Sequence, residues 1–147
     1  MKIMLINGPN LNMLGQREPG LYGSKTLAEI EAGIKELGRE LGLEVECFQS
    51  NIEGELVDVI QRAGTTANGA ILNAGAYTHT SVAIRDAVLC CGVPVVEVHL
   101  TNPHAREEYR QVSLLSGAGA GAIAGFGQES YALALHWFAR RKAEAGE

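Results

Sequence analysis

The chain has 147 residues, of which 46% are hydrophobic and 20% charged, and its formal net charge is −5 at pH 7. At roughly 150 residues a domain buries about 70% of its unfolded surface, so we expect one domain with its own core over residues 1–147. The acidic balance argues against nucleic-acid binding, which needs a basic face. No apolar run reaches the roughly 18 residues of a membrane span.

Two further features indicate the cellular compartment. The chain starts MKIMLING, without the layout of a signal peptide. Its three cysteines, Cys47, Cys90 and Cys91, are an odd number and two are adjacent, so they predict neither a disulfide framework nor a zinc site. We therefore expect a cytoplasmic protein that contacts neither membranes nor nucleic acids.

Strand-like and helical patterns alternate from the first residues onward. Lys2–Asn7 is predicted to form a strand, followed by a long loop from Gly8 to Lys25. Thr26 is a candidate N-cap of the next helix, because Glu29 completes a capping box three residues later. This helix ends at Gly42 and carries one apolar stripe, formed by Leu27, Ile30, Ile34, Leu37 and Leu41.

The rest of the chain repeats this alternation. The further elements are predicted as strand Leu43–Gln49, helix Glu53–Ala63, strand Gly69–Asn73, helix Ser81–Cys91, strand Val93–Leu100, strand Gly121–Phe126 and helix Ser130–Lys142, and we expect Glu144–Glu147 to fray. The strands are nearly continuous in apolar residues, which is typical of parallel sheets covered on both faces. We therefore expect an α/β fold, a flavodoxin-like doubly wound parallel sheet of five strands with helices on both faces.

The GAGAGA stretch at Gly117–Ala122 is similar to a phosphate loop only in composition. It precedes a predicted strand, whereas a phosphate loop follows a strand and opens a helix. Close packing or a flexible lead-in explains it better than a phosphate site.

Polar side chains follow strand after strand at the predicted carboxyl ends, where open parallel sheets bind ligands. They are Asn7, Asn10, Asn12, Gln49, Ser50, Asn51, Asn73, Tyr77, His79, Glu97, His99, Thr101 and Asn102. We expect these amides and imidazoles to converge on one crevice that suits a small ligand rich in hydroxyl groups.

Several enzyme classes lack their motifs in this sequence. There is no G-x-S-x-G, G-x-G-x-x-G or G-x-x-x-x-G-K-[ST] pattern, which argues against hydrolase, dinucleotide and P-loop chemistry. None of the four lysines follows a strand in the apolar setting that a Schiff-base lysine needs. A metal site formed by His79, His99 and His104 stays open, although their spacing lacks the HExxH order. What remains is general acid–base chemistry without a cofactor.

Arg17 and Tyr22 lie on the loop after the first strand, beside the expected crevice. A free phenol is a poor base, since only about 0.1% of it is ionised at neutral pH. An arginine about 4 Å away favours the phenolate by up to about 4 kcal/mol, which makes such a phenol a usable base. Alternatively, Tyr22 packs under the loop and Arg17 is a surface cation.

The sequence strongly resembles the type II 3-dehydroquinate dehydratases. The likeness lies in NGPNLNMLGQREPGLYG from Asn7, QSNIEGELVDVI from Gln49, ILNAGAYTHTSVAIRDA from Ile71, PVVEVHLTNPHAREEYR from Pro94 and IAGFGQESYALAL from Ile123. It implies a flavodoxin-like hydro-lyase that converts 3-dehydroquinate to 3-dehydroshikimate through an enolate, in the shikimate pathway of chorismate and aromatic amino-acid biosynthesis. It also implies a homododecamer and no cofactor or metal.

The resemblance also assigns roles to single residues. Tyr22 corresponds to the base, Arg17 to the residue that activates it, and His99 to the proton donor. Glu97 would orient His99, and Asn10 would position the enolate or a bridging water. The residues implied in substrate binding are Asn73, His79, Asp86 (often from a neighbouring subunit), Arg110 and the backbone amides of Leu100 and Thr101. This chain has HLTN where the family commonly has HLSN, and the threonine keeps both hydroxyl and amide.

A non-catalytic flavodoxin-like module for ligand binding or signalling is the alternative. A receiver-like domain needs clustered acids after its first strand, where this chain has Asn7 and Asn10. A flavin carrier needs aromatic side chains around the ring, yet aromatic residues make up only 5% of the chain.

Overall fold

The computed structural model describes residues 1–16 and 18–146 and contains one parallel sheet of five strands in the order β2-β1-β3-β4-β5. The strands are β1 (Lys2–Asn7), β2 (Glu44–Gln49), β3 (Gly69–Asn73), β4 (Val95–His99) and β5 (Gly121–Ala124). Every pair of neighbouring strands is parallel. This order is the flavodoxin-like one, so the predicted fold class is confirmed.

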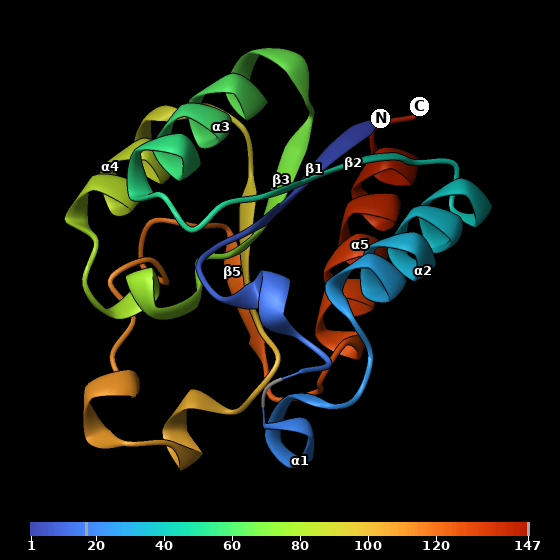
Figure 1. Ribbon diagram of the computed structural model, residues 1–147. Coiled ribbons are helices and arrows are strands. Elements are labelled where there is room, and N and C mark those ends of the chain that lie inside the picture. The colour runs from blue at the N-terminus through green and yellow to red at the C-terminus, as the bar shows by residue number, and fades with distance from the viewer. Residues whose placement is uncertain (17, 147) are drawn as a thin grey trace.

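Two pairs of helices cover the two faces of the sheet (Figure 1). Helices α2 (Leu27–Glu40) and α5 (Glu129–Glu144) lie on one face, and α3 (Glu53–Thr66) and α4 (Val82–Cys90) lie on the other. Each face has its own apolar core, because successive residues of a strand point to opposite sides. None of the helices in the described ranges is long and apolar enough to cross a membrane.

The predicted start of α2 is confirmed in detail. The Thr26 side chain accepts a hydrogen bond from the backbone N–H of Glu29, and the Glu29 carboxylate accepts one from the backbone N–H of Thr26. After the helix, Gly42 adopts a φ of 69°, a left-handed conformation that glycine reaches without strain. The chain then turns directly into β2.

The predicted loop at Gly8–Lys25 is partly wrong. It contains a 3-10 helix at Leu11–Met13 and the short helix α1 at Pro19–Tyr22. Pro19 is the first residue of α1. The φ of proline is already close to the helical value, and proline has no backbone N–H that would lack a partner at this position, so the segment can form a helical turn.

The other deviations concern the lengths of elements. Helix α3 continues past the predicted end to Thr66, where the hydroxyls of Thr65 and Thr66 both donate to the carbonyl of Arg62. Strand β5 ends at Ala124 because the next residue, Gly125, has a φ of 97°. Helix α5 includes Glu144, one of the residues expected to fray.

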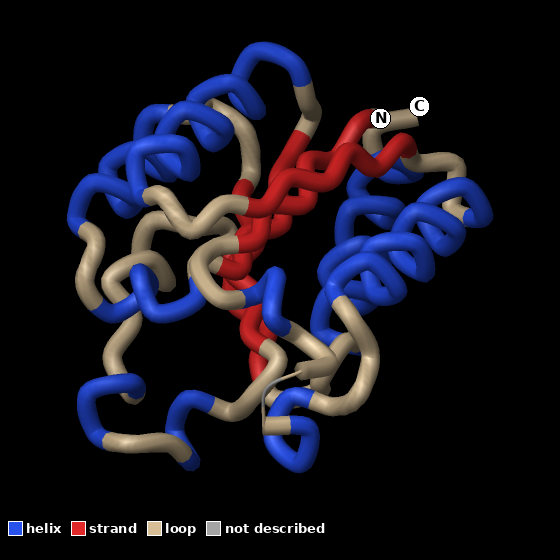
Figure 2. Tube along the Cα trace, viewed as in Figure 1, coloured by secondary structure: helices blue, strands red, loops and turns tan. Residues whose placement is uncertain are grey.

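Parallel register brings the polar strand ends to one edge of the sheet. Asn7 of β1 is paired with Asn73 of β3, and Leu72 of β3 is paired with Glu97 of β4. The segments that follow these strands gather at this edge, the lower one in Figures 1 and 2. The fold therefore places the residues expected in the crevice close together.

Gly64 tests how closely α3 approaches α4. A Cβ atom at this position would lie 1.9 Å from the Cys91 carbonyl oxygen, so we expect Gly64→Ala to destabilise the fold by about 1–3 kcal/mol. Gly33 on α2 is the matched control, because no described atom beyond its chain neighbours and its own helix backbone lies within 4 Å of its Cβ position. Gly33→Ala should stabilise the fold by about 1 kcal/mol through helix propensity. Urea unfolding of both variants measures the change in unfolding free energy. No change in Gly64→Ala would contradict the close packing of α3 against Cys91.

Candidate active site

A cavity of about 110 Å³ lies at the carboxyl edge of the sheet. Its walls come from the segments after β1, β3 and β4 and from α1. Of the predicted site residues, it is lined by Asn10, Tyr22, Asn73, His79, His99, Leu100, Thr101 and Arg110. The prediction of one crevice at these strand ends is thus confirmed for three strands.

The polar end of β2 is the exception. Gln49 and Asn51 do not line the cavity. Gln49 Nε2 donates to the carbonyl of Gly8 and to Asn51 Oδ1, and the Asn51 amide oxygen also accepts from the backbone N–H of Asn10. The expectation that β2 contributes to the crevice is wrong, because these amides hold the loop after β1 instead.

Tyr22 contacts an arginine, but from an unexpected segment. Its hydroxyl accepts a hydrogen bond of 3.2 Å from Nη1 of Arg106, and the same nitrogen donates to Thr101 Oγ1 at 3.1 Å. Burial lowers the pKa of Arg106, but the Tyr22 hydroxyl and the nearby Glu107 and Glu18 raise it more, so the guanidinium is a permanent positive charge. A cation therefore lies directly at the phenol.

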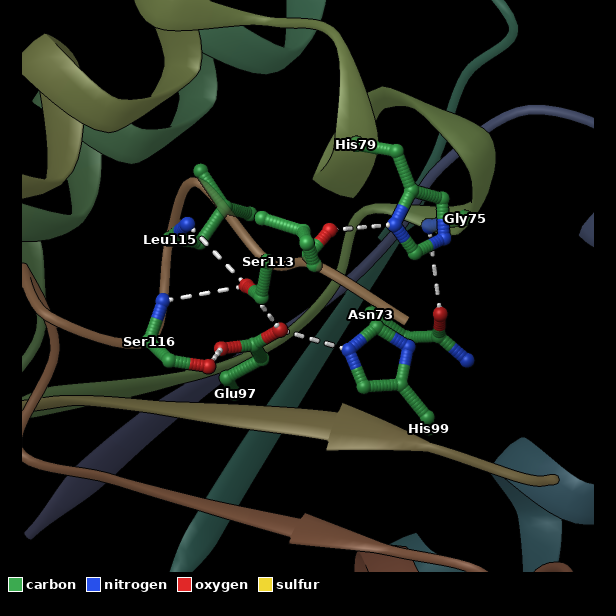
Figure 3. A network of polar contacts seen from close by, with 9 residues as sticks. Asn73, Gly75, His79, Glu97, His99, Ser113, Leu115 and Ser116 are labelled. Atoms are coloured by element: carbon green, nitrogen blue, oxygen red, sulfur yellow. Dashed lines mark hydrogen bonds and ion pairs between the residues drawn. The ribbon is translucent and has the colours of Figure 1, made fainter. Parts of the chain in front are cut away.

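His99 lies at the end of β4 and forms a pair with Glu97 (Figure 3). Nε2 of the imidazole is 2.6 Å from Oε1 of Glu97, whose side chain is only 3% exposed. A carboxylate accepts, so Nε2 carries a proton and donates it to this bond. Nδ1 is then the ring nitrogen that remains for a ligand in the cavity.

Two serines complete the surroundings of Glu97. Ser113 Oγ donates to Oε1 at 2.7 Å, and Ser116 Oγ donates to Oε2 at 2.5 Å. Burial by itself raises the pKa of Glu97, but the hydrogen bonds from His99, Ser116 and Ser113 outweigh it and hold this pKa below its ordinary value. The carboxylate therefore stays ionised next to the imidazole.

Asn73 and His79 face the cavity with defined hydrogen-bonding groups. Oδ1 of Asn73 accepts from the backbone N–H of Gly75 at 3.2 Å, and Nδ1 of His79 is 2.7 Å from the carbonyl oxygen of Val112 (Figure 3). A carbonyl oxygen only accepts, so Nδ1 of His79 carries a proton. Both side chains are thus held in one orientation beside the cavity.

Arg110 and Asn10 close two sides of the cavity. Arg110 ends a 3-10 helix at Glu108–Arg110, and its Nε lies 3.1 Å from Oε2 of Glu107. Asn10 adopts a φ of 65°, which asparagine tolerates better than most residues. The cavity therefore combines a phenol, two imidazoles, two amides and two guanidinium groups.

Two predicted site residues are not part of this arrangement. Asp86 lies exposed on α4 and does not line the cavity. Arg17 lies outside the described residues. Within the described ranges there is also no group of three or more His, Cys, Asp or Glu side chains that could hold a metal ion.

Comparison with known proteins decides the family. Residues 1–139 match the family model described as class II dehydroquinase. The chain belongs to this family. The resemblance derived from the motifs is therefore confirmed.

Curated and solved members of the class II dehydroquinases agree with this assignment. The 3-dehydroquinate dehydratase of Prochlorococcus marinus is 59% identical over 135 residues, which cover 92% of this chain and 91% of the relative. That of Rhizobium johnstonii is 58% identical over 134 residues, covering 91% and 92%. The crystal structure of type II dehydroquinase from Propionibacterium acnes superposes with a TM-score of 0.92 at 42% identity, covering 95% of this chain and 96% of that one.

Three residues that contact predicted site residues could not be predicted from the sequence. Arg106, Ser113 and Ser116 contact Tyr22 or Glu97 but follow no recognisable spacing. Arg106 lies within the matched stretch from Pro94, yet nothing in that stretch indicates that it reaches a tyrosine 84 positions earlier. The two serines could have been suspected, because a buried carboxylate such as Glu97 needs hydrogen-bond donors and the polar segment after β4 contains hydroxyl groups.

Ser116→Ala removes one donor to Glu97 and is expected to raise the pKa of that carboxyl group. The pKa of Glu97 is lower in the folded than in the unfolded protein, where it is near 4.5. The ionised carboxylate therefore stabilises the fold at pH values above 4.5, and this stability is lost as the pH falls through the pKa of the folded state. The variant should therefore lose about 1–2 kcal/mol of unfolding free energy at neutral pH and less in acid. Urea unfolding over a pH series measures this.

Thr65→Ala is the matched control for this experiment. It also deletes a hydroxyl, but one that is exposed and donates to the backbone carbonyl of Arg62. Its effect should not change between neutral and acidic pH. An equal loss at every pH in Ser116→Ala would contradict the role of Ser116 in holding the charge of Glu97.

Proposed function

We propose that this protein is a 3-dehydroquinate dehydratase, a hydro-lyase that removes water from 3-dehydroquinate to give 3-dehydroshikimate in the shikimate pathway. Membership of the class II dehydroquinases supports the reaction. The observation that carries the proposal is the cavity itself, in which a phenol beside a guanidinium and an imidazole backed by a buried carboxylate line the same space. An elimination needs one group to take a proton and another to give one.

Tyr22 takes the proton in this proposal. The phenolate removes a proton from the carbon next to the ketone, and the electrons of the broken C–H bond form an enolate. Arg106 donates a hydrogen bond to the Tyr22 oxygen and holds it in place for this step, and Arg17 acts on the same residue. Asn10 positions the enolate or a water molecule that bridges to it.

His99 gives the proton that the leaving hydroxyl needs. Nε2 is committed to Glu97, so Nδ1 of the protonated ring donates to the departing oxygen, which leaves as water. The enolate electrons close the new C=C bond as the C–O bond breaks. The ionised Glu97 accepts the hydrogen bond from Nε2 and holds the ring with Nδ1 available to the leaving group. After each turnover the phenol of Tyr22 releases its proton to solvent and Nδ1 of His99 takes one up from solvent, which resets both groups.

The remaining residues bind and orient the substrate. Asn73 and His79 contact its hydroxyl groups, and Arg110 and the backbone N–H groups of Leu100 and Thr101 contact its carboxylate. All five line the cavity. The elimination needs only a base and an acid, which Tyr22 and His99 supply, so we propose that no cofactor or metal takes part.

We further propose a cytoplasmic homododecamer. Asp86 is exposed on α4, away from the cavity of its own chain, where it can serve the site of a neighbouring subunit. Three cysteines without a disulfide fit a reducing compartment. We propose that the protein binds neither nucleic acids nor membranes.

Tyr22→Phe tests the proposal together with wild-type turnover. Wild-type protein treated with a chelator should convert 3-dehydroquinate to a product with enone absorbance. Tyr22→Phe removes the base but keeps the ring, so we expect kcat to fall by at least about 10²-fold and substrate affinity to change by less than about tenfold. Arg106→Ala should also lower kcat, because it removes the hydrogen bond that holds the Tyr22 hydroxyl.

Tyr109→Phe is the control, because it removes the hydroxyl of a tyrosine that is 68% exposed and does not line the cavity. It should keep wild-type turnover. Full activity in Tyr22→Phe would show that another residue is the base. Absence of product with the wild-type protein would overturn the proposed function as a whole.

A further inference from the structure

A chain of buried hydrogen bonds connects α5 to the cavity. The Tyr131 hydroxyl accepts from Asn73 Nδ2 at 2.9 Å and donates to Asn7 Oδ1 at 2.6 Å. Tyr131 and Asn7 are 0% exposed and Asn73 is 3% exposed. Tyr131 itself does not line the cavity. Of its two hydrogen-bond partners named here, Asn73 lines the cavity and Asn7 does not.

The proton count fixes the direction of these bonds. A tyrosine hydroxyl has one proton, and the amide oxygen of Asn7 can only accept it. The hydroxyl is then left to accept, so the amide of Asn73 must turn its Nδ2 toward Tyr131. On the other edge of the same amide, Oδ1 accepts from the backbone N–H of Gly75, as Figure 3 shows.

The reversed amide of Asn73 is excluded by the same count. Turning the amide over would place Nδ2 against the N–H of Gly75 and leave two donors facing each other. It would also place Oδ1 against a hydroxyl whose proton is already used. Buried polar groups without partners are costly, so the two bonds together hold one orientation. Nδ2 has a second hydrogen, which remains for a ligand in the cavity that Asn73 lines.

We propose that Tyr131 is a positioning residue, which sets the amide of Asn73 so that Nδ2 donates to a substrate hydroxyl. This inference rests on the proposed function, because it gives Asn73 its part in substrate binding. Burial raises the pKa of Tyr131, so its hydroxyl keeps its proton over the working range of pH. The strand register supports the same geometry, since Asn7 and Asn73 are paired neighbours in β1 and β3.

Tyr131→Phe combined with Asn73→Ala separates positioning from a structural role. Tyr131→Phe keeps the ring in the core and deletes the hydroxyl, so we expect KM for 3-dehydroquinate to rise by about fivefold to tenfold with a smaller change in kcat. In an Asn73→Ala background, adding Tyr131→Phe should leave KM unchanged, because the group it positions is gone.

Ser130→Ala is the matched control on the same turn of α5. Ser130 is also 0% exposed, and its hydroxyl accepts from the backbone N–H of Phe126, which does not line the cavity. Both Tyr131→Phe and Ser130→Ala should lower the melting temperature, whereas only Tyr131→Phe should raise KM. If Tyr131→Phe does not fold, Asn7→Ala releases the Tyr131 hydroxyl from its other side, and the same dependence on Asn73 is expected.

The outcomes distinguish this inference from the proposed function. An unchanged KM in folded Tyr131→Phe, or an equal rise with and without Asn73, would overturn the positioning role and leave the dehydratase proposal intact. If Asn73→Ala itself leaves KM unchanged, both the positioning role and the substrate contact of Asn73 are overturned. Wild-type protein without turnover would instead overturn the dehydratase proposal.

Discussion

The parallel register of the sheet is the constraint on which the site depends. Because β1, β3 and β4 run in the same direction, the segments after them meet at one edge, and polar residues that are far apart in the chain line one cavity. The pairing of Asn7 with Asn73 also allows one hydroxyl from α5 to contact both amides. A shift of one strand by one residue would turn these side chains to the other face.

Several buried polar groups at this edge are held by specific partners, and Glu97 has the largest number of them. Glu97 is ionised although its side chain is only 3% exposed, because an imidazole and two serines donate to it. The segments that supply these donors follow β4 and precede β5. The same residues therefore keep Glu97 ionised and, through Glu97, hold the ring of His99 in one orientation.

Much of the fold could be predicted from the sequence, since apolar runs and the capping box at Thr26 are local signals. Eight of the residues predicted from the motifs and from their position after strands line one cavity. The contact between Arg106 and Tyr22 could not be predicted, because it joins segments 84 positions apart and depends on how two loops fold back. The hydrogen bonds of Tyr131 could not be predicted either, because a tyrosine ring is compatible with an apolar helix face. Only the structure shows that its hydroxyl donates to Asn7.

A crystal structure of Tyr22→Phe with bound 3-dehydroquinate is the most direct test of the claim that residues after β1, β3 and β4 bind one substrate molecule. We predict the substrate in the cavity of about 110 Å³, with a hydroxyl at Asn73 Nδ2, the leaving hydroxyl at Nδ1 of His99 and the carboxylate near Arg110. A larger cavity of about 650 Å³ lies nearby, bounded by Phe126 and Gln128. Substrate bound there, with the cavity at the strand ends empty, would contradict this account.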